Sequence, residues 1–424
     1  MRDPAQRVGP RAWVALAILC LVYVLNFVDR QLLSILAKPI QDNLHVSDGQ
    51  LGLIGGLYFA LFYCLIAIPV GWLADRTNRV RVLAGACALW SAATVACGLS
   101  VNYPQLVVAR MTVGIGEAGG VPPSYAIISD YFPPSRRGTA LAIFNLGPPI
   151  GQAIGVAAGA SIAAAFGWRA AFVALGAVGV VVAATVLSVR EPRRGGLDPA
   201  AAVATAKAGF AETVRMFFTT PVLLLMAVAS GVTQIITYGS GNFSTLFLMR
   251  EKGMTLGEVA IWVALIVAVF MSGGIFVSGR VIDRFTRKSR QAYALVPAVS
   301  LIAAAPLFLG FALAPTWPIA LVFLAGVTSL NYFYLSSAVA LVQQTVRPDQ
   351  RVLCGALLLL VMNLMGLGIG PAFVGAVSDH FHGAHPHSSL KLAFLCLLPL
   401  YALAVVLFLA LAGALRRETG AATP

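Results

Sequence analysis

Charge is scarce in this chain. Only 11% of its 424 residues are Asp, Glu, Lys or Arg, whereas 59% are hydrophobic. A soluble domain of this size needs more charged residues to cover its surface, so the composition excludes one. The mean hydropathy of +0.86 points instead to a protein that lies largely within a membrane.

Loop cysteines and enzyme motifs are also lacking. All six cysteines fall within long apolar runs, which excludes a disulfide framework. The chain contains no ATP-binding P-loop, no H-E-x-x-H and no defensible pair of nucleophile and base. We therefore expect neither an enzyme nor a cofactor. A membrane sensor is a weaker alternative, because no signalling domain is recognisable.

Histidine is rare, and four of the five histidines lie between His380 and His387. Imidazoles at this spacing can bind Zn or Cu. A short loop that contains Pro386 gives poor geometry for a metal, so we expect a solvent-exposed loop and no metal site.

What the chain has in abundance is long apolar runs. About 20 apolar residues suffice for a helix to cross a bilayer, and the runs predict twelve such helices. They cover residues 12–37, 50–74, 80–100, 104–129, 138–165, 168–189, 221–248, 258–282, 290–313, 316–342, 351–378 and 388–414.

A charged motif at the end of one run is repeated half a chain later. Gly71-x-x-x-Asp75-Arg76-x-x-Arg79 recurs 208 residues on as Gly279-x-x-x-Asp283-Arg284-x-x-Arg287. Such internal duplication is typical of transporters built from two related bundles. We predict an all-α integral membrane protein with twelve transmembrane helices in two pseudo-symmetric six-helix bundles, residues 1–189 and 221–424. Residues 190–220 form a cytoplasmic linker, with an amphipathic helix around Phe210 to Phe218.

The basic residues predict the orientation. With the N-terminus inside, most of the 29 Lys and Arg residues fall in inner segments, which places both termini in the cytoplasm. The net charge of +13 then faces anionic lipid headgroups, and no nucleic-acid partner is needed to explain it. We expect a monomer in a bacterial inner membrane.

Several motifs resemble those of the major facilitator superfamily over the whole chain. Gly71–Arg81 is similar to the family's loop between spans two and three, although Asn78 replaces the usual Gly. Arg110–Glu117 resembles the fourth-span motif, and Gly147–Gly151 with Gly155 resembles the fifth-span motif. Asn26-Phe-Val-Asp29-Arg30 together with Gly116-Glu117-Ala118 resembles the spinster group of lysolipid and sphingolipid transporters. The first of these patterns also occurs, more loosely, among organic anion:proton symporters.

The resemblance implies a conformational latch at the inner ends of the bundles. Its clusters would hold the outward-facing state closed on the inside, and the alternative is ordinary charge at helix ends. The residues concerned are Gly71, Asp75, Arg76, Arg79, Asp130, Arg137, Asp283 and Arg284.

Four charged residues lie deep in predicted spans, all in the first half: Asp29, Arg30, Arg110 and Glu117. Buried charge in a membrane is costly, so such residues are functional candidates. At 1.5 Å per residue, Asp29, Arg30 and Arg110 lie at similar heights, and Glu117 lies about 10 Å deeper as a lone carboxylate. Neighbouring residues point about 100° apart on a helix, so at least one of Asp29 and Arg30 should be free for substrate.

We expect Asp29 and Glu117 to couple transport to protons, and Arg30, Arg110 and Glu117 to contact substrate. A purely structural Asp29–Arg110 pair and a protonated packing role for Glu117 remain alternatives. The second half offers only neutral polar candidates for substrate binding, Tyr238, Asn331 and Tyr334, which could equally hydrogen-bond between helices.

These features favour a proton-coupled secondary transporter that works by alternating access. A headgroup at an arginine and an alkyl tail in the uncharged half suit a lysophospholipid- or sphingolipid-like amphiphile. The alternatives are symport of an organic anion, such as a sugar acid or aromatic acid, with protons, and efflux of hydrophobic drugs.

Overall fold

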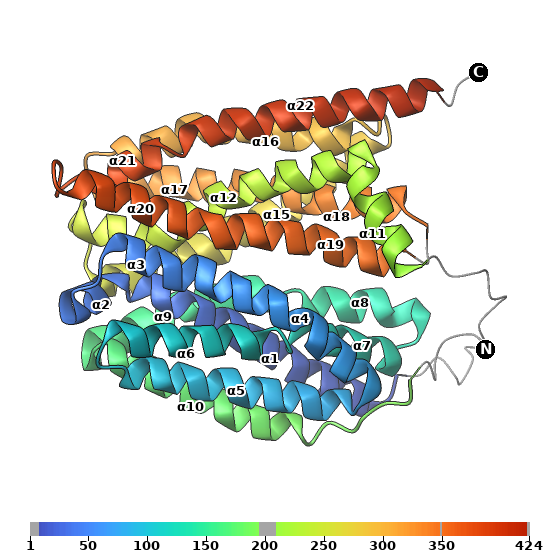
Figure 1. Cartoon of the computed structure of the whole chain (residues 1–424), viewed down its shortest axis with the longest axis horizontal. Coiled ribbons are helices and arrows are strands. Elements are labelled where there is room, and N and C mark those ends of the chain that lie inside the picture. Colours follow the sequence, from blue (N-terminus) through green and yellow to red (C-terminus); the bar gives the residue numbers. More distant parts are fainter. Residues whose placement is uncertain (1–7, 195–208, 348–349, 422–424) are drawn as a thin grey trace. The chain divides into compact units, whose positions relative to one another are not determined.

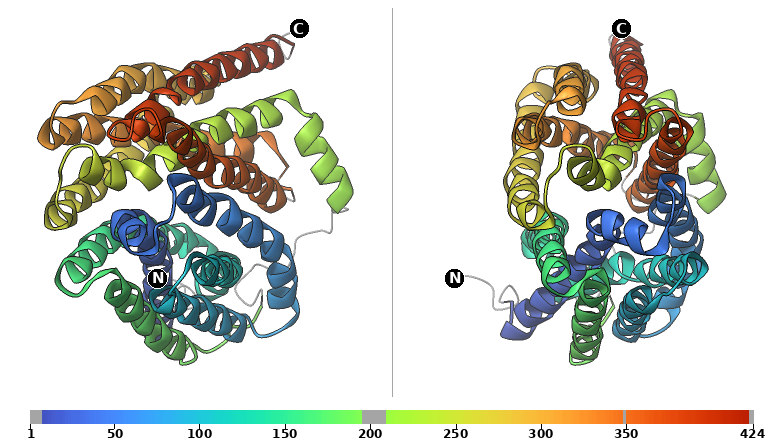
Figure 2. Two further views of the ribbon diagram at one scale, coloured as in Figure 1. Left: turned by 60° about the vertical axis from the view of Figure 1, so that its left-hand side comes forward. Right: turned by 90° about the vertical axis from the view of Figure 1, so that its left-hand side faces the viewer.

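The computed structural model describes residues 8–194, 209–347 and 350–421, and all regular secondary structure in these residues is helical (Figure 1). Eleven helical segments of the described chain are long and apolar enough to cross a membrane. The helices divide into two compact units. Within each unit the long helices run roughly along one direction, and the right-hand view of Figure 2 looks nearly down their axes.

The first unit is built from residues 1–46, 58–204 and 259–264. Its helices are α1 (Pro10–Ile35), α2 (Ala37–Leu44), α4 (Tyr58–Arg76), α5 (Arg79–Leu99), α6 (Tyr103–Glu117), α7 (Val121–Tyr131), α8 (Pro134–Phe144), α9 (Gly147–Phe166), α10 (Trp168–Val186) and the π-helical turn η3 (Val259–Val263).

The predicted fourth span is two helices, because a turn at residues 118–120 separates α6 from α7. Gly119 and Gly120 weaken the helix there, and Pro122 and Pro123 lack the N–H groups that would continue its ladder. The break leaves Glu117 as the last residue of α6. Hydropathy alone does not reveal this interruption of the helix beside a buried carboxylate.

Glycines set the closest helix contacts of this unit. A Cβ on Gly151 would lie 2.3 Å from the carbonyl oxygen of Val24, so α9 touches the backbone of α1. A Cβ on Gly176 would lie 2.9 Å from the carbonyl oxygen of Ser91, so α10 also packs closely on α5. These contacts fix α1 and α5, the two helices that surround Asp29.

The second unit is built from residues 47–57, 205–258 and 265–424. Its elements are α3 (Asp48–Gly52), η2 (Leu53–Leu57), α11 (Phe210–Thr219), α12 (Pro221–Arg250), α13 (Leu256–Glu258), α14 (Ala264–Ile266, which starts in the first unit), η4 (Val267–Met271), α15 (Ser272–Thr286), α16 (Ala292–Leu313), α17 (Trp317–Asn331), α18 (Phe333–Thr345), α19 (Arg351–Asn363), η5 (Leu364–Ile369), α20 (Gly370–His382), α21 (Ser389–Leu395) and α22 (Leu398–Ala421).

The first turns of the second span belong to this unit. A Cβ on Gly52 would lie 2.3 Å from the carbonyl oxygen of Pro371, and one on Gly375 would lie 2.4 Å from that of Asp48. α3 therefore packs backbone to backbone on α20. The predicted division into bundles at residues 190–220 stays a prediction, and residues 195–208 of the predicted linker lie outside the described chain.

The predicted amphipathic helix of the linker is present as α11. Thr213 and Phe217, one turn apart, are buried, whereas Arg215 and Thr219 on the opposite face are exposed. One face thus packs on the second unit and the opposite face is free for other contacts.

Candidate functional site

Two oppositely charged pairs lie together in the core of the first unit. Arg30 Nε donates to Glu117 Oε2 at 2.6 Å, and Arg110 Nη1 lies 4.0 Å from Asp29 Oδ1. Each helix supplies one acid and one base, α1 through Asp29 and Arg30, and α6 through Arg110 and Glu117. We call these four residues the charged quartet; its formal charges balance.

The two neighbours on α1 point to different partners. The Thr94 hydroxyl on α5 donates to Asp29 Oδ2, whereas the Arg30 guanidinium lies over the rings of Phe27, Phe59 and Tyr63, 5.0, 5.2 and 5.0 Å from their centroids. Three aromatic faces and a carboxylate together stabilise this cation in a poorly hydrated place.

Burial separates the two arginines. The Arg110 side chain is 3% exposed and lies against Phe59, while that of Arg30 is 15% exposed. Arg30 is therefore the cation of the quartet that an entering ligand can reach with the smaller rearrangement.

Two sequence-based predictions about the quartet are wrong. Glu117 is not a lone carboxylate, and neither Asp29 nor Arg30 is without a partner. Residue spacing gives only the depth of each Cα along the helix axis. An arginine side chain extends several ångströms from its Cα, so Arg30 reaches the Glu117 carboxylate at a different depth.

The three neutral candidates lie in the second unit. The Asn331 amide and the Tyr401 hydroxyl hydrogen-bond to each other at 3.0 and 3.2 Å, both within the core. Tyr334 is 2% exposed, and Tyr238 is half-buried. Asn331 and Tyr334 thus pack between helices, and their substrate-binding role remains a prediction.

The predicted latch residues are only partly assembled. Arg79 donates from Nη1 to Asp130 at 2.6 Å and from Nε to Glu191 at 2.7 Å, and Glu191 also accepts the backbone N–H of Val80 at 3.0 Å. Glu191 was not predicted, since nothing in its sequence context distinguishes it from an ordinary charge after the sixth span. It ties the start of the linker to α5.

Other predicted latch residues make further contacts of their own. Arg137 donates to the Ser129 carbonyl at 2.7 Å, Arg76 lies over Trp72 at 4.2 Å, and Gly71 has open space around its Cα. Asp283 and Arg284 are exposed on α15. The side chain of Asp75 lies outside the described part.

Replacing Arg79 with alanine should lower the thermal stability of the purified protein. Its two carboxylate partners would then lose the guanidinium that bonds to both of them. A hydrogen bond to a charged group contributes about 1.5–3 kcal/mol. Thermal unfolding in detergent measures the effect, with Arg81→Ala as the control, because Arg81 is exposed. Equal midpoints for the two variants would contradict a stabilising cluster.

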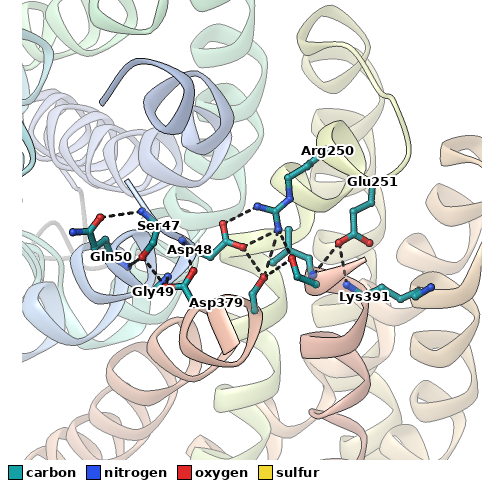
Figure 3. Close-up of polar contacts among 11 residues, drawn as sticks. Ser47, Asp48, Gly49, Gln50, Arg250, Glu251, Asp379 and Lys391 are labelled. Atoms are coloured by element: carbon teal, nitrogen blue, oxygen red, sulfur yellow. Dashed lines mark hydrogen bonds and ion pairs between the residues drawn. The ribbon is translucent and has the colours of Figure 1, made fainter. Parts of the chain in front are cut away.

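A second polar network, which the sequence did not predict, lies in the second unit (Figure 3). Arg250 at the end of α12 donates two hydrogen bonds to Asp48 at the start of α3, from Nη1 to Oδ1 at 2.9 Å and from Nη2 to Oδ2 at 2.7 Å. Ser378 on α20 donates to Asp48 Oδ2 at 2.6 Å. Asp48 is 3% exposed, so its charge depends on these partners.

Two further carboxylates cap helix starts in the same network. Asp379 accepts the Ser47 hydroxyl at 2.7 Å and the backbone N–H groups of Asp48 and Gly49 at 2.9 Å. Glu251 accepts the N–H groups of Leu390 and Lys391 at 2.8 and 3.3 Å. Burial raises the pKa of Glu251, although these two donors oppose the rise. We call Asp48, Arg250, Ser378 and Asp379 the α3 anchor.

The histidines at the end of α20 and after it are exposed. The described residues contain no group of three or more His, Cys, Asp or Glu side chains that could hold a metal ion.

Comparison with known proteins places these features in a family. The Major Facilitator Superfamily model matches residues 19–352. An MFS-type efflux pump of Mycolicibacterium smegmatis is 34% identical over 379 residues, 89% of this chain and 87% of the relative. A hexuronate transporter of Bacillus subtilis is 27% identical over 86% of this chain and 88% of the relative.

Among solved structures, the chain is similar to a bacterial homolog of the human lysosomal transporter spinster, in an inward-facing and unoccupied conformation. The TM-score is 0.91 at 29% identity, covering 97% of this chain and 98% of the other. The family model spans most of the chain, and the predicted resemblance to the spinster group is confirmed. The protein therefore belongs to the major facilitator superfamily of multi-pass membrane transporters.

Proposed function

We propose that the protein is a proton-coupled secondary transporter that works by alternating access. It moves a lysophospholipid- or sphingolipid-like amphiphile with an anionic or zwitterionic headgroup. The observation that carries the proposal is the charged quartet: two carboxylates held next to two guanidinium groups in the core of the first unit.

In this mechanism the ionised Glu117 carboxylate and the headgroup of the ligand compete for the same cation, Arg30. The Arg30–Glu117 bond of 2.6 Å ties up the more accessible arginine while Glu117 is ionised. A proton on Glu117 removes the counter-charge and leaves Arg30 to bind an oxyanion of the headgroup. The Asp29–Arg110 pair provides a second carboxylate that can take up a proton. A proton on either carboxylate leaves the quartet with one excess positive charge, which the anionic group of a bound headgroup would balance.

The surroundings of Arg30 favour an amphiphile over a fully polar substrate. Phe27, Phe59 and Tyr63 present ring faces next to the guanidinium. An oxyanion bound there would place its adjoining methylene groups against aromatic carbon. The 29% identity to the spinster homolog supports the same class.

The other two substrate classes are outcomes of the test. Similarity to a hexuronate transporter supports an organic anion, and similarity to an efflux pump supports a hydrophobic drug. We further propose a monomer in a bacterial inner membrane with both termini in the cytoplasm, which accessibility labelling of Cys residues placed at either end would test.

Flux in proteoliposomes should distinguish these classes. Purified protein is reconstituted, a pH gradient is imposed, and the movement of lysophosphatidylethanolamine, glucuronate and ethidium is measured in parallel. We expect gradient-dependent movement of the lysolipid that is lost in Arg30→Ala and retained in Arg169→Ala. Arg169 is the matched control because it lies outside the quartet, where it donates to Asn43 and the Ser100 carbonyl and lies over the ring of Trp168. Saturable glucuronate or ethidium transport without lysolipid movement would contradict the proposal.

A further inference from the structure

A small cavity lies where α1, α5 and α10 meet in the first unit. It offers about 10 Å³ to the centre of a water molecule, and its wall includes Asp29, Ser91, Thr94 and Gly179. A Cβ on Gly179 would lie 2.3 Å from Ser91 Oγ. The absence of a side chain at this position of α10 therefore lets the Ser91 hydroxyl lie directly against the α10 backbone in the cavity wall.

Two polar atoms of the cavity wall are buried with incomplete hydrogen bonding. Asp29 is 5% exposed and Ser91 is 2% exposed. Asp29 Oδ1 and Ser91 Oγ have no nitrogen or oxygen hydrogen-bond partner among the described residues. The Thr94 hydroxyl already serves the other carboxylate oxygen, Oδ2. Buried polar atoms in native proteins are almost always satisfied, by protein or by ordered water.

We propose that this cavity binds one water molecule, which donates a hydrogen bond to Asp29 Oδ1 and accepts one from the Ser91 hydroxyl. The volume corresponds to one water, and buried waters typically have two to four polar partners. The site is defined by the first unit alone, so the water itself does not depend on what the protein transports.

Charge favours a water over a small cation. The quartet already balances two carboxylates with two guanidinium groups, and Arg110 Nη1 lies only 4.0 Å from Asp29 Oδ1. A sodium ion in the cavity would add an unbalanced charge next to that guanidinium in a region of low dielectric. The wall also supplies too few oxygen atoms to replace the hydration shell of a cation.

The role of the water rests on the proposed function. The hydrogen bond from the water stabilises the ionised form of Asp29. A Ser91→Ala variant that lacks this bond should therefore keep Asp29 protonated to higher pH. The other charged or titratable groups that act on Asp29 are Arg110, Glu117, Arg30, Cys87 and Cys97. A change at Ser91 leaves Arg110, Glu117, Arg30 and Cys97 in place, but it removes a hydrogen bond between Ser91 and the Cys87 thiol.

The site is tested by a structure of the full-length protein in nanodiscs, at a resolution that shows ordered water. We expect a single peak about 2.6–3.2 Å from both Asp29 Oδ1 and Ser91 Oγ, and its loss in the double variant Ser91→Ala/Gly179→Ala. An empty cavity would overturn the proposal. So would a peak with shorter contacts to more oxygen atoms that appears only in sodium buffer.

The role is tested by the pH midpoint of lysolipid flux. We expect Ser91→Ala to move the midpoint upward by about one pH unit, the size of one charge-assisted hydrogen bond. Ser124→Ala is the matched control, since Ser124 is also buried but donates to the Gly120 carbonyl away from the cavity. An unchanged midpoint in Ser91→Ala would overturn the role. A parent protein whose flux ignores pH would instead refute the proton coupling proposed above, while the ordered-water peak would still decide the site.

Discussion

Glu117→Gln should abolish the pH dependence of transport while the protein still folds. Glutamine has the shape of a protonated glutamate and keeps an oxygen that can accept from Arg30 Nε. The variant is therefore fixed in the state that a proton on Glu117 would produce. Because Glu117 is fully buried and bonded to Arg30 at 2.6 Å, we expect its ionisation to control whether that arginine is available.

The expected size of the Glu117→Gln effect follows from the free energy of the buried Arg30–Glu117 pair. Breaking a buried ion pair by neutralising one partner costs about 3–5 kcal/mol, and glutamine retains part of the contact. A residual effect of about 2–3 kcal/mol would change the population of the paired state by roughly thirty- to a hundredfold, since 1.4 kcal/mol corresponds to about tenfold. Flux at pH 6 and pH 8 should then be equal within error in the variant and unequal in the parent.

Glu191→Gln is the matched control for this prediction. Glu191 also bonds to an arginine Nε, at 2.7 Å from Arg79, but lies outside the quartet. It should leave the pH dependence unchanged. If Glu117→Gln retains the pH dependence of the parent, Glu117 is a structural carboxylate, and Asp29→Asn becomes the variant to examine.

The sequence distinguishes the four charged residues that lie together in the core of the first unit. Asp29, Arg30, Arg110 and Glu117 stood out because each interrupts an apolar run, and the structure brings all four together. Their pairing could not be deduced. It depends on the direction and reach of each side chain, and on the aromatic rings of Phe59 and Tyr63, which carry no signal of their own in an apolar span.

The α3 anchor shows the opposite case, since no sequence feature announced it. Asp48 and Arg250 are 202 residues apart, and each lies two residues beyond the predicted end of its span. At those positions a charge is expected to face water. Tertiary packing overrides that expectation, because Gly52 and Gly375 let the α3 backbone approach α20 and so bury Asp48.

Arg250→Ala should destabilise the protein strongly, because it leaves the Asp48 carboxylate buried with Ser378 as its main remaining donor. Removal of one partner of a buried pair costs about 3–5 kcal/mol. Thermal unfolding of the purified protein measures the loss, and Lys252→Ala serves as the control. Lys252 follows closely in the chain but donates only to the Ala314 carbonyl and lies over the ring of Phe247.

A double-mutant cycle separates the pair from simple truncation. Asp48→Asn removes the charge that Arg250 balances. The loss of stability in Asp48→Asn/Arg250→Gln should therefore be smaller than the sum of the losses in Asp48→Asn and Arg250→Gln. Additive losses would mean that the two bonds contribute little beyond packing.

The α3 anchor should also influence the populations of the states in alternating access. Residues 50–57 begin the predicted second span, which the sequence assigns to the first bundle, yet they pack in the second unit with residues 47–49. Bundles that move relative to each other must break this contact in some state of the cycle. A contact present in one state alone biases the equilibrium by its own free energy, so Arg250→Ala should increase the population in which α3 has left α20.

Distances between spin labels at the exposed positions His45 and His387 should widen in Arg250→Ala and stay unchanged in Lys252→Ala. Identical distance distributions in the parent and Arg250→Ala would show that the anchor is a permanent part of the second unit and takes no part in the cycle.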